Sequence, residues 1–318
     1  MSTVRCILGT FAKYLASLPA WRHQIKLQNR MSTSPHPVAA VCQLTVTPNK
    51  EANFSACKQL VDEAKERGAS MVFLPENFDY IGSSREETLS LSESLTGDTI
   101  SRYSQLARQL GVWLSLGGFH ERGHDWESDR RIYNSHIIIN DKGDIVSVYR
   151  KSHLFDVELP EKGISLKESG FTIPGPSLMS PVQTPIGKVG QGICYDLRFP
   201  ELSLALQRHG AEILTYPSAF TVATGAAHWE VLLRARAIEN QCFVIAAAQV
   251  GRHTEKRSSY GHTLVVDPWG EVLGDCGGEK PGMVLVEIDL EKVSSTRMNM
   301  PVQQHRRDTG FYKSLEKT

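Results

Sequence analysis

The sequence predicts an α/β fold in which two sheets pack against each other between outer layers of helices, a four-layer α-β-β-α sandwich built from two similar halves. From Val38 on, apolar runs of strand length alternate with helical patterns. The order of these elements repeats, and residues 68–78 align without a gap over residues 210–220, as do residues 137–146 over residues 264–273. Each half alone would leave one sheet face uncovered, and packing the two sheets together buries both faces.

Strands are predicted from short apolar runs, and hairpins from turn residues between two such runs. The expected strands of the first half are residues 39–46, 71–74 and 112–119, with a hairpin of 133–140 and 144–149. The expected strands of the second half are residues 188–194, 213–216 and 242–248, with a hairpin of 262–266 and 271–273. Cys194 would therefore end the first strand of the second half.

Four helices are predicted between these strands, at residues 52–67, 98–110, 200–209 and 228–240. Gly68 and Gly111 would end the first two helices, and Asp98 or Thr99 would cap the second. Pro200 suits the first turn of the third. In the fourth helix we expect three side chains to point inward: Val231, Ala235 and Ile238.

The formal net charge of the 318 residues is zero, but the charges are unevenly distributed. Residues 1–30 contain five basic residues and no acidic one, which leaves 30 basic and 35 acidic residues in the rest, a net charge of −5. A basic, amphipathic leader without acids is typical of a mitochondrial transit peptide. Met31 resembles a second start, which would produce a cytoplasmic form. We therefore predict a transit peptide at 1–30, a globular domain at 36–307 and a tail at 308–318.

The rest of the chain lacks the patterns of membrane, nucleic-acid and metal partners. No apolar run approaches the roughly 18 residues needed to span a bilayer, and no basic patch indicates a nucleic-acid interface. The six cysteines are far apart and form no C-x-x-C pair, which argues against a zinc site and against a disulfide scaffold. No glycine-rich nucleotide-binding motif is present.

Cys194 is the strongest candidate for a nucleophile. It follows Gly190 and Gly192, which allow close approach of the backbone at the end of a predicted strand. Ligands bind at the carboxyl ends of strands in α/β proteins, and a deprotonated thiol there can attack an electrophile. The alternative is a buried, inert thiol.

Glu76 and Lys151 also follow predicted strands. In the repeat alignment Ser218 stands opposite Glu76, so the carboxylate is particular to the first half. We expect burial at the end of an apolar strand to raise the pKa of Glu76 toward that of a general base. The ammonium of Lys151 would favour a thiolate and stabilise an oxyanion. A capping or solvated glutamate and a surface lysine are the alternatives.

Three motifs resemble those of a known family. They are residues 73–77 (Phe-Leu-Pro-Glu-Asn), 149–156 (Tyr-Arg-Lys-Ser-His-Leu-Phe-Asp) and 192–201 (Gly-Ile-Cys-Tyr-Asp-Leu-Arg-Phe-Pro-Glu). In this order they resemble the signatures of the nitrilase superfamily of carbon–nitrogen hydrolases, in particular its Nit branch. The resemblance implies a sandwich of the nitrilase type and a carbon–nitrogen hydrolase domain at 36–307.

The resemblance also implies a role for each motif. Glu76 would be the general base, and Lys151 the oxyanion stabiliser or proton donor. Cys194 would be the nucleophile, which forms a thioester with the substrate. The backbone N–H of Tyr195 would share the oxyanion with Lys151.

Other polar side chains have both a functional and a structural interpretation. The family often has a second glutamate near the lysine, and Glu168 fits this place best. The weaker candidates for it are Glu158 and Glu161. Arg198 could bind a substrate carboxylate, or it could form an ion pair with Asp196, Glu201 or Glu239. His228 could line the pocket, partner a cysteine or open a helix.

The resemblance implies an amidase that acts on a small acidic amide and needs no metal or organic cofactor. Within the Nit branch, the expected substrate is deaminated glutathione, cleaved to 2-oxoglutarate and Cys-Gly. An omega-amidase acting on other 2-oxo-acid amides and a non-catalytic binding scaffold are the alternatives. We expect a homodimer or homotetramer, with residues 301–318 at an interface between subunits.

Overall fold

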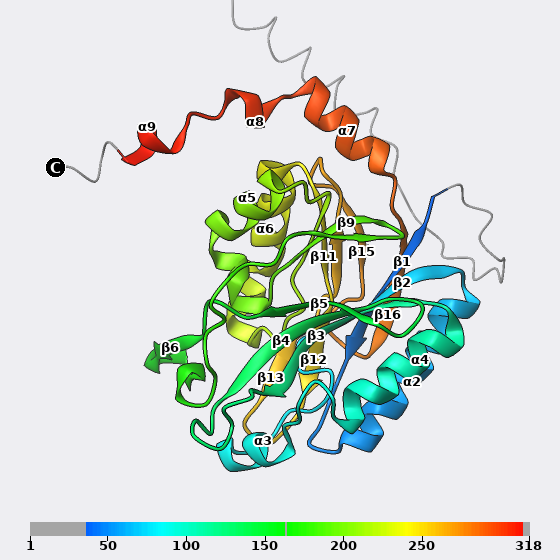
Figure 1. Ribbon diagram of the computed structural model, residues 1–318. Coiled ribbons are helices and arrows are strands. Elements are labelled where there is room, and N and C mark those ends of the chain that lie inside the picture. Colours follow the sequence, from blue (N-terminus) through cyan, green and yellow to red (C-terminus); the bar gives the residue numbers. More distant parts are fainter. Residues whose placement is uncertain (1–35, 163, 314–318) are drawn as a thin grey trace, which may run out of the picture. The chain divides into compact units, whose positions relative to one another are not determined.

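Eight strands form the larger sheet of the computed structural model, which describes residues 36–162 and 164–313 (Figure 1). The strands are β1 (Val38–Leu44), β2 (Ala69–Leu74), β3 (Trp113–Arg122), β4 (Ile132–Ile139), β5 (Ile145–Arg150), β12 (Ala248–Arg252), β13 (Ser258–Tyr260) and β16 (Gly282–Glu287). Their order is β13-β12-β1-β2-β3-β4-β5, and β16 also pairs with β1. β1, β2 and β3 are parallel to one another, whereas β4 and β5 continue the sheet antiparallel.

The smaller sheet repeats this pairing with the second half of the chain. Its strands are β8 (Val182–Thr184), β9 (Gly187–Gln191), β10 (Ile213–Thr215), β11 (Phe243–Ala246), β14 (Leu264–Val266) and β15 (Val272–Asp275). They follow the order β15-β14-β11-β10-β9-β8. β9, β10 and β11 are parallel, and β14 and β15 continue antiparallel, as β1 to β5 do. The prediction of two similar halves is confirmed.

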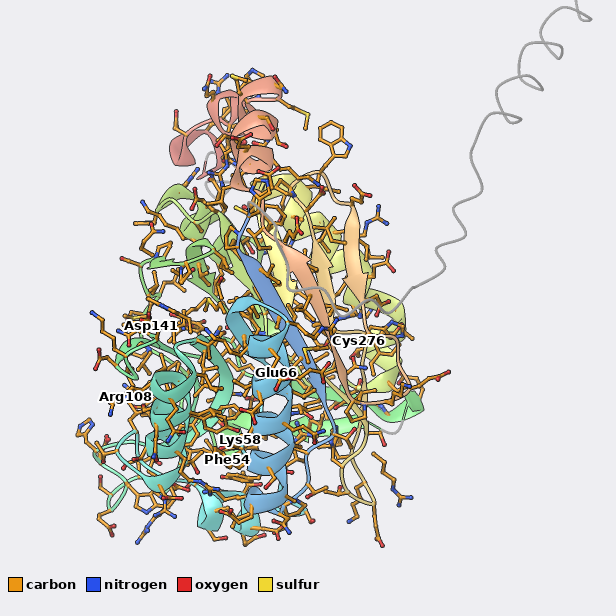
Figure 2. The ribbon with its side chains drawn as sticks, turned by 90° about the vertical axis from the view of Figure 1, so that its right-hand side faces the viewer. Phe54, Lys58, Glu66, Arg108, Asp141 and Cys276 are labelled. Atoms are coloured by element: carbon orange, nitrogen blue, oxygen red, sulfur yellow. The ribbon has the colours of Figure 1, made fainter. Side chains whose placement is uncertain are left out.

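Helices cover the outer face of each sheet. The helices of the described residues are α2 (Lys50–Glu66), α3 (Arg85–Leu91), α4 (Asp98–Leu110), α5 (Pro200–Arg208), α6 (Val222–Asn240), α7 (Leu290–Asn299), α8 (Val302–His305) and α9 (Thr309–Lys313). In Figure 1, α2 and α4 lie against the larger sheet, and α5 and α6 lie against the smaller one. Figure 2 looks onto α2, whose exposed Lys58 and Glu66 stand on its outer side.

Three clusters of buried apolar side chains separate the four layers. Val61 of α2 packs with Val72 of β2 in the first cluster, and Leu233 of α6 packs with Leu214 of β10 in the second. The third cluster lies between the sheets, where Phe73 of the larger sheet joins residues of the smaller sheet such as Phe243. Removal of this apolar surface from water, at roughly 25 cal/mol per Å², is the main force that holds the sandwich together.

Two predicted strands differ from the structure. The apolar run 242–248 is divided, because β11 belongs to the smaller sheet and β12 to the larger, with the chain crossing at Ala247. The run 188–194 is a strand only to Gln191, and Cys194 begins a 3-10 turn that extends to Arg198. In both places the backbone leaves its sheet while the apolar run continues in the sequence. The apolar pattern therefore does not mark the end of the strand.

The predicted buried face of the fourth helix is wrong. α6 begins at Val222, and Val231 and Ile238 are exposed. The buried stripe is instead Trp229, Leu233 and Ala237, spaced by four residues. The helix is apolar on more than one side, so its hydrophobic periodicity does not distinguish the two stripes.

The predicted cap of α4 is also wrong, because Gly97 occupies the N-cap position. Thr99 instead donates from its backbone and its hydroxyl to the carboxylate of Glu93. The predicted stop at Gly111 is confirmed, with a left-handed backbone.

Some predictions concern residues that the structure does not describe. The predicted transit peptide at 1–30 and the last five residues of the predicted tail lie outside the described residues. Over residues 36–162 and 164–313, no helix combines the length and the apolar character needed to cross a membrane.

Candidate active site

The ends of three strands bring Glu76, Lys151 and Cys194 into one buried site. Glu76 comes two residues after β2, Lys151 directly follows β5, and Cys194 comes three residues after β9. Glu76 is 4% exposed and Lys151 is 2% exposed. Cys194 and Asn77, the neighbour of Glu76, have positive φ angles of 45° and 59°. Such angles cost free energy in residues other than glycine, and they cluster at functional sites.

Lys151 binds two carboxylates. Its Nζ lies 3.0 Å from Oε1 of Glu76 and 3.0 Å from both carboxylate oxygens of Glu168. Two anions around one cation leave this cluster with a net charge of −1. A buried ion pair of this kind needs additional hydrogen bonds to offset the loss of hydration.

Those additional hydrogen bonds come from Asn134 and from the backbone. Nδ2 of Asn134 lies 2.9 Å from Oε1 of Glu76 and 3.3 Å from Oε1 of Glu168. The backbone N–H of Ala219 donates to Oε2 of Glu76 at 2.9 Å. Gln249 holds the backbone of the same residue, donating to the Glu76 carbonyl at 3.0 Å. The carboxylate of Glu76 is therefore fixed at both oxygens.

Glu168 is positioned by a hairpin that the sequence did not predict. β6 (Asp156–Leu159) and β7 (Ile164–Lys167) pair antiparallel, and Glu168 follows directly in a 3-10 turn. The backbone N–H of Phe155, at the start of the hairpin, donates to Oε2 of Glu168 at 2.7 Å. The weaker candidates, Glu158 and Glu161, are exposed, and Glu158 accepts a hydrogen bond from Ser165.

The pKa values establish where the protons lie at rest. Burial would raise the pKa of Glu76, but Lys151 and hydrogen bonds from Cys194 and Asn134 hold it below its ordinary value. Burial would lower the pKa of Lys151, but the two carboxylates raise it well above the ordinary value. Burial and the charge of Glu76 raise the pKa of the Cys194 thiol, and the opposing effect of Lys151 is smaller. The resting site therefore contains a carboxylate, an ammonium and a protonated thiol.

One electrostatic expectation is wrong, and a second is confirmed in its direction but is outweighed by other effects. The prediction that burial raises the pKa of Glu76 is wrong, because its contacts with Lys151 and Asn134 outweigh burial. Lys151 does favour the thiolate of Cys194, as expected, but burial and Glu76 outweigh it. Glu76 and the thiol are hydrogen-bonded, so the proton can move to the carboxylate as sulfur attacks.

Arg198 and His228 lie together beside Tyr195. Nη2 of Arg198 is 3.2 Å from Nδ1 of His228, and its guanidinium stands over the rings of Tyr195 and Phe220. Two of the acids considered as ion-pair partners of Arg198 have other partners among the described residues. Asp196 pairs with His153, and Glu239 pairs with Arg236. His228 lies in the second turn of α6 and does not open the helix as one interpretation expected.

Sequence reasoning missed several buried polar residues around the site, above all Asn134, Asp196 and Gln249. Each is no more than 8% exposed and makes hydrogen bonds to the segments that carry the predicted residues. The available signal was a polar residue within an otherwise buried strand or turn, because burial of such a group is favourable only with hydrogen-bond partners.

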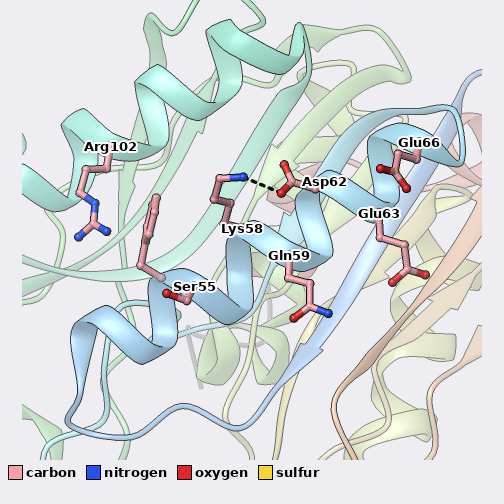
Figure 3. Close-up of a pocket in the computed structure, with 8 residues that line it drawn as sticks. Ser55, Lys58, Gln59, Asp62, Glu63, Glu66 and Arg102 are labelled. Carbon is pink, nitrogen blue, oxygen red and sulfur yellow. Dashed lines mark hydrogen bonds and ion pairs between the residues drawn. The ribbon is translucent and has the colours of Figure 1, made fainter.

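Away from these three side chains, the described residues form a hollow but no cluster of metal-ligating side chains. No group of three or more His, Cys, Asp or Glu side chains is arranged to hold a metal ion in the described part of the chain. A hollow on the helix layer is lined by residues of α2 and by Arg102 of α4 (Figure 3). Its other lining residues include Lys58 and Asp62, which pair with each other across one helical turn. The lining residues of the hollow include no cysteine.

The profile of the carbon-nitrogen hydrolase family matches residues 38–298. The chain belongs to this family. A protein of Bos taurus named "Deaminated glutathione amidase" is 60% identical over 276 residues, which cover 87% of this chain and 84% of the relative. The protein of the same name from Homo sapiens is 60% identical over 271 residues, which cover 85% of this chain and 82% of the relative.

Two crystal structures share the fold of this carbon–nitrogen hydrolase. The NitFhit protein of C. elegans is 48% identical with a TM-score of 0.80, and the match covers 86% of this chain and 65% of that one. Nit3 of Saccharomyces cerevisiae, described as a member of branch 10 of the nitrilase superfamily, is 31% identical with a TM-score of 0.74, covering 86% and 97%. The predicted nitrilase-type sandwich and the resemblance to the Nit branch are confirmed.

Proposed function

We propose that this carbon–nitrogen hydrolase is an amidase that cleaves deaminated glutathione to 2-oxoglutarate and Cys-Gly. The observation that carries the chemistry is the hydrogen-bonded set of Glu76, Lys151 and a protonated Cys194. The choice of substrate is supported by relatives of that name with 60% identity over most of both chains.

Acylation begins with attack of the Cys194 sulfur on the amide carbonyl. Glu76 takes the thiol proton as the S–C bond forms, and the carbonyl electron pair moves to oxygen. The ammonium of Lys151 and the backbone N–H of Tyr195 stabilise this oxyanion. When the intermediate collapses, the C–N bond breaks, and Glu76 returns the proton to the leaving amine. A thioester on Cys194 remains.

Deacylation repeats these steps with water. Glu76 takes a proton from water, and the resulting hydroxide attacks the thioester carbonyl. The oxyanion is stabilised as before, and the C–S bond then breaks. Glu76 gives its proton to the departing thiolate, so each group returns to its starting state. Glu168 keeps Lys151 in place throughout, and no step requires a metal or an organic cofactor.

We infer that Arg198 and His228 recognise a carboxylate of the substrate. Arg198 is the cation nearest in sequence to the nucleophile on the C-terminal side, and its guanidinium rests on the ring of Tyr195. A guanidinium binds a carboxylate through two parallel hydrogen bonds, which favours acidic over neutral amides. The net charge of −5 outside residues 1–30 offers no general attraction for such a substrate, so local cations must supply it.

A kinetic panel tests the substrate and the nucleophile together. The full chain is given deaminated glutathione, 2-oxo-acid amides of the omega-amidase type, and a neutral amide of equal size. We expect the highest kcat/KM for deaminated glutathione and the lowest for the neutral amide. Equal values for all three, or preference for the omega-amidase substrates, would contradict the proposed substrate.

Replacement of Cys194, compared with replacement of another cysteine as a control, tests the proposed nucleophile. Cys194→Ala should abolish hydrolysis, at least about 10⁴-fold, because no other group can form the thioester. Cys276→Ala removes another partly buried thiol and should leave activity unchanged. Full activity of Cys194→Ala would overturn the mechanism and favour a binding scaffold.

We further propose that the chain forms a homodimer or homotetramer and occurs in two compartments. The exposed apolar residues Val222, Val231 and Ile238 of α6 support self-association. Light scattering of the full chain and of Val231→Lys tests self-association, and a monomer in both cases rules it out.

Imaging of tagged full-length and Met31-start forms tests mitochondrial against cytoplasmic location. Identical distributions of the two forms would exclude residues 1–30 as a targeting signal.

A further inference from the structure

Asp196, two residues after the nucleophile, connects the two segments that carry Cys194 and Lys151. It is fully buried, and it is not among the groups that react in the proposed mechanism. Its carboxylate accepts four hydrogen bonds, and these come from both segments. A buried carboxylate with this number of donors is strongly held and in turn holds its donors.

One oxygen of Asp196 binds the segment that follows Lys151. Oδ1 accepts from the backbone N–H of His153 at 3.1 Å and from its Nδ1 at 2.7 Å. Because an ionised carboxylate is only an acceptor, Nδ1 of His153 carries the hydrogen. The ring of His153 is stacked on Phe199, with ring centroids 3.7 Å apart. The position of the chain two residues after Lys151 is thus determined by Asp196 and an aromatic contact.

The other oxygen binds the start of the nucleophile turn and the strand before Lys151. Oδ2 accepts from the backbone N–H of Ile193 at 3.0 Å and from the hydroxyl of Tyr149 at 2.8 Å. Ile193 directly precedes Cys194, whose backbone has the strained φ of 45°. Tyr149 is in β5 of the larger sheet, whereas the turn follows β9 of the smaller sheet. Asp196 therefore ties together chain segments that come from different sheets.

We propose that Asp196 is a positioning residue that keeps the sulfur of Cys194 in register with the ammonium of Lys151 and the carboxylate of Glu76. Arg236 of α6 supports the same turn from the other side, donating from Nε to the carbonyl of Leu197 at 3.0 Å. A misplacement of about 1 Å between reacting groups costs on the order of 100-fold in rate. This inference rests on the proposed role of Cys194 as the nucleophile.

Asp196→Asn tests this positioning role in the full chain. The amide keeps the size of the carboxylate, but its NH₂ group faces donors at one of the two sites. We expect kcat to fall about 100-fold with little change in KM, because binding of the substrate does not depend on the alignment of sulfur. The matched control is Asp267→Asn, which alters another buried carboxylate that accepts from two backbone N–H groups and from Lys292.

A readout without substrate separates positioning from folding and from the proposed function. Alkylation of Cys194 by iodoacetamide, followed by mass spectrometry of the Cys194 peptide, reports whether Glu76 can still take the thiol proton. We expect Asp196→Asn to slow alkylation at least about 10-fold, and Asp267→Asn to leave it unchanged at a similar loss of melting temperature. If the wild type failed to hydrolyse the amides, the proposed substrate would be wrong. The alkylation rates of the two variants would still test the role of Asp196.

A second pair of variants covers the case in which Asp196→Asn does not fold. Tyr149→Phe removes one of the four donors, and Tyr80→Phe removes a buried hydroxyl that donates to the carbonyl of Thr88 instead. We expect a smaller fall in kcat and in alkylation rate for Tyr149→Phe alone. Equal effects of the two tyrosine variants, or an unchanged or faster alkylation in Asp196→Asn, would overturn the proposal.

Discussion

At the scale of single residues, the site depends on one cation shared by two carboxylates. Lys151 binds Glu76, the proposed general base, and Glu168, which takes no part in the proposed proton transfers. The proton-transferring role requires a carboxylate whose second oxygen can approach the thiol. With Glu168 present, Lys151 is held by two carboxylates while it contacts only one oxygen of Glu76.

Replacing Glu168 with glutamine separates these two roles. Glu168→Gln removes the negative charge that pairs with Lys151. It also weakens the hydrogen bond that residue 168 accepts from the backbone N–H of Phe155. We expect kcat/KM to fall about 100-fold, because the oxyanion-stabilising ammonium is no longer preorganised. Steady-state kinetics measure the effect. Glu158→Gln, in the same hairpin but exposed, is the control and should retain wild-type kinetics; an equal loss in both would refute the role of Glu168.

The residues that are proposed to react, and Glu168 beside them, could be predicted from the sequence, whereas the other residues that support them could not. Glu76, Lys151 and Cys194 each follow a strand, and strand ends converge in α/β folds. Asn134 is polar, but it sits within β4 next to two other polar residues, Ser135 and His136, so the local pattern does not single it out. The lowered pKa of Glu76 has the same origin, since it arises from contacts with Lys151 and Asn134, 75 and 58 residues away in the chain.

At the scale of elements, the backbone of β3 closely approaches Glu76. Gly118 has a φ of 68°, and its carbonyl accepts from the N–H of Asn77 at 3.1 Å. A Cβ atom at this position would lie 2.6 Å from Cγ of Glu76. The strand can therefore approach the general base closely only because this residue is glycine.

Gly118→Ala should displace the general base. We expect a loss of kcat of about 100-fold together with a loss of stability, since the new methyl group and Glu76 cannot both keep their positions. Gly111→Ala is the control, because that glycine also has a positive φ, 57°, but open space around a Cβ. The control should cost about 1 kcal/mol of stability and no activity. Thermal unfolding measures the stability of both variants, and steady-state kinetics measure their kcat. Wild-type activity of Gly118→Ala would contradict the need for glycine beside Glu76.

The elements themselves were predictable where a single face is buried and less so where several are. In α2 the buried apolar residues Cys57, Val61 and Ala64 follow a helical period, because the other side of the helix is polar. In α6, Val231 and Ile238 were expected inside, but Trp229 and Leu233 occupy the buried stripe. Packing of the large Trp229 side chain selects between the two stripes. The hydrophobic periodicity of the helix does not predict this contact.

At the scale of the whole molecule, we expect two buried histidines to make the fold sensitive to acid. His136 of β4 contacts the hydroxyl of Ser115 and the carbonyl of Gly192, which connects the larger sheet to the segment before Cys194. His253 contacts the carbonyl of Val46 and the hydroxyl of Ser259. Burial lowers the pKa of each imidazole from 6.5 to about 4. Both rings are therefore neutral in the folded protein at neutral pH.

The stability of the fold should fall as the pH drops from about 6.5 to 4. In this window the unfolded chain binds a proton at each histidine and the folded chain does not, so acid favours unfolding. A pKa lowered from 6.5 to about 4 corresponds to about 3 kcal/mol per histidine. Urea unfolding at pH 7 and pH 4.5 measures the loss. His253→Gln should lose about 2.5 kcal/mol less than the wild type between these two pH values, whereas His124→Gln, at an exposed position, should match the wild type. The same pH-driven loss in the wild type and in His253→Gln would show that the buried imidazole does not cause the acid sensitivity.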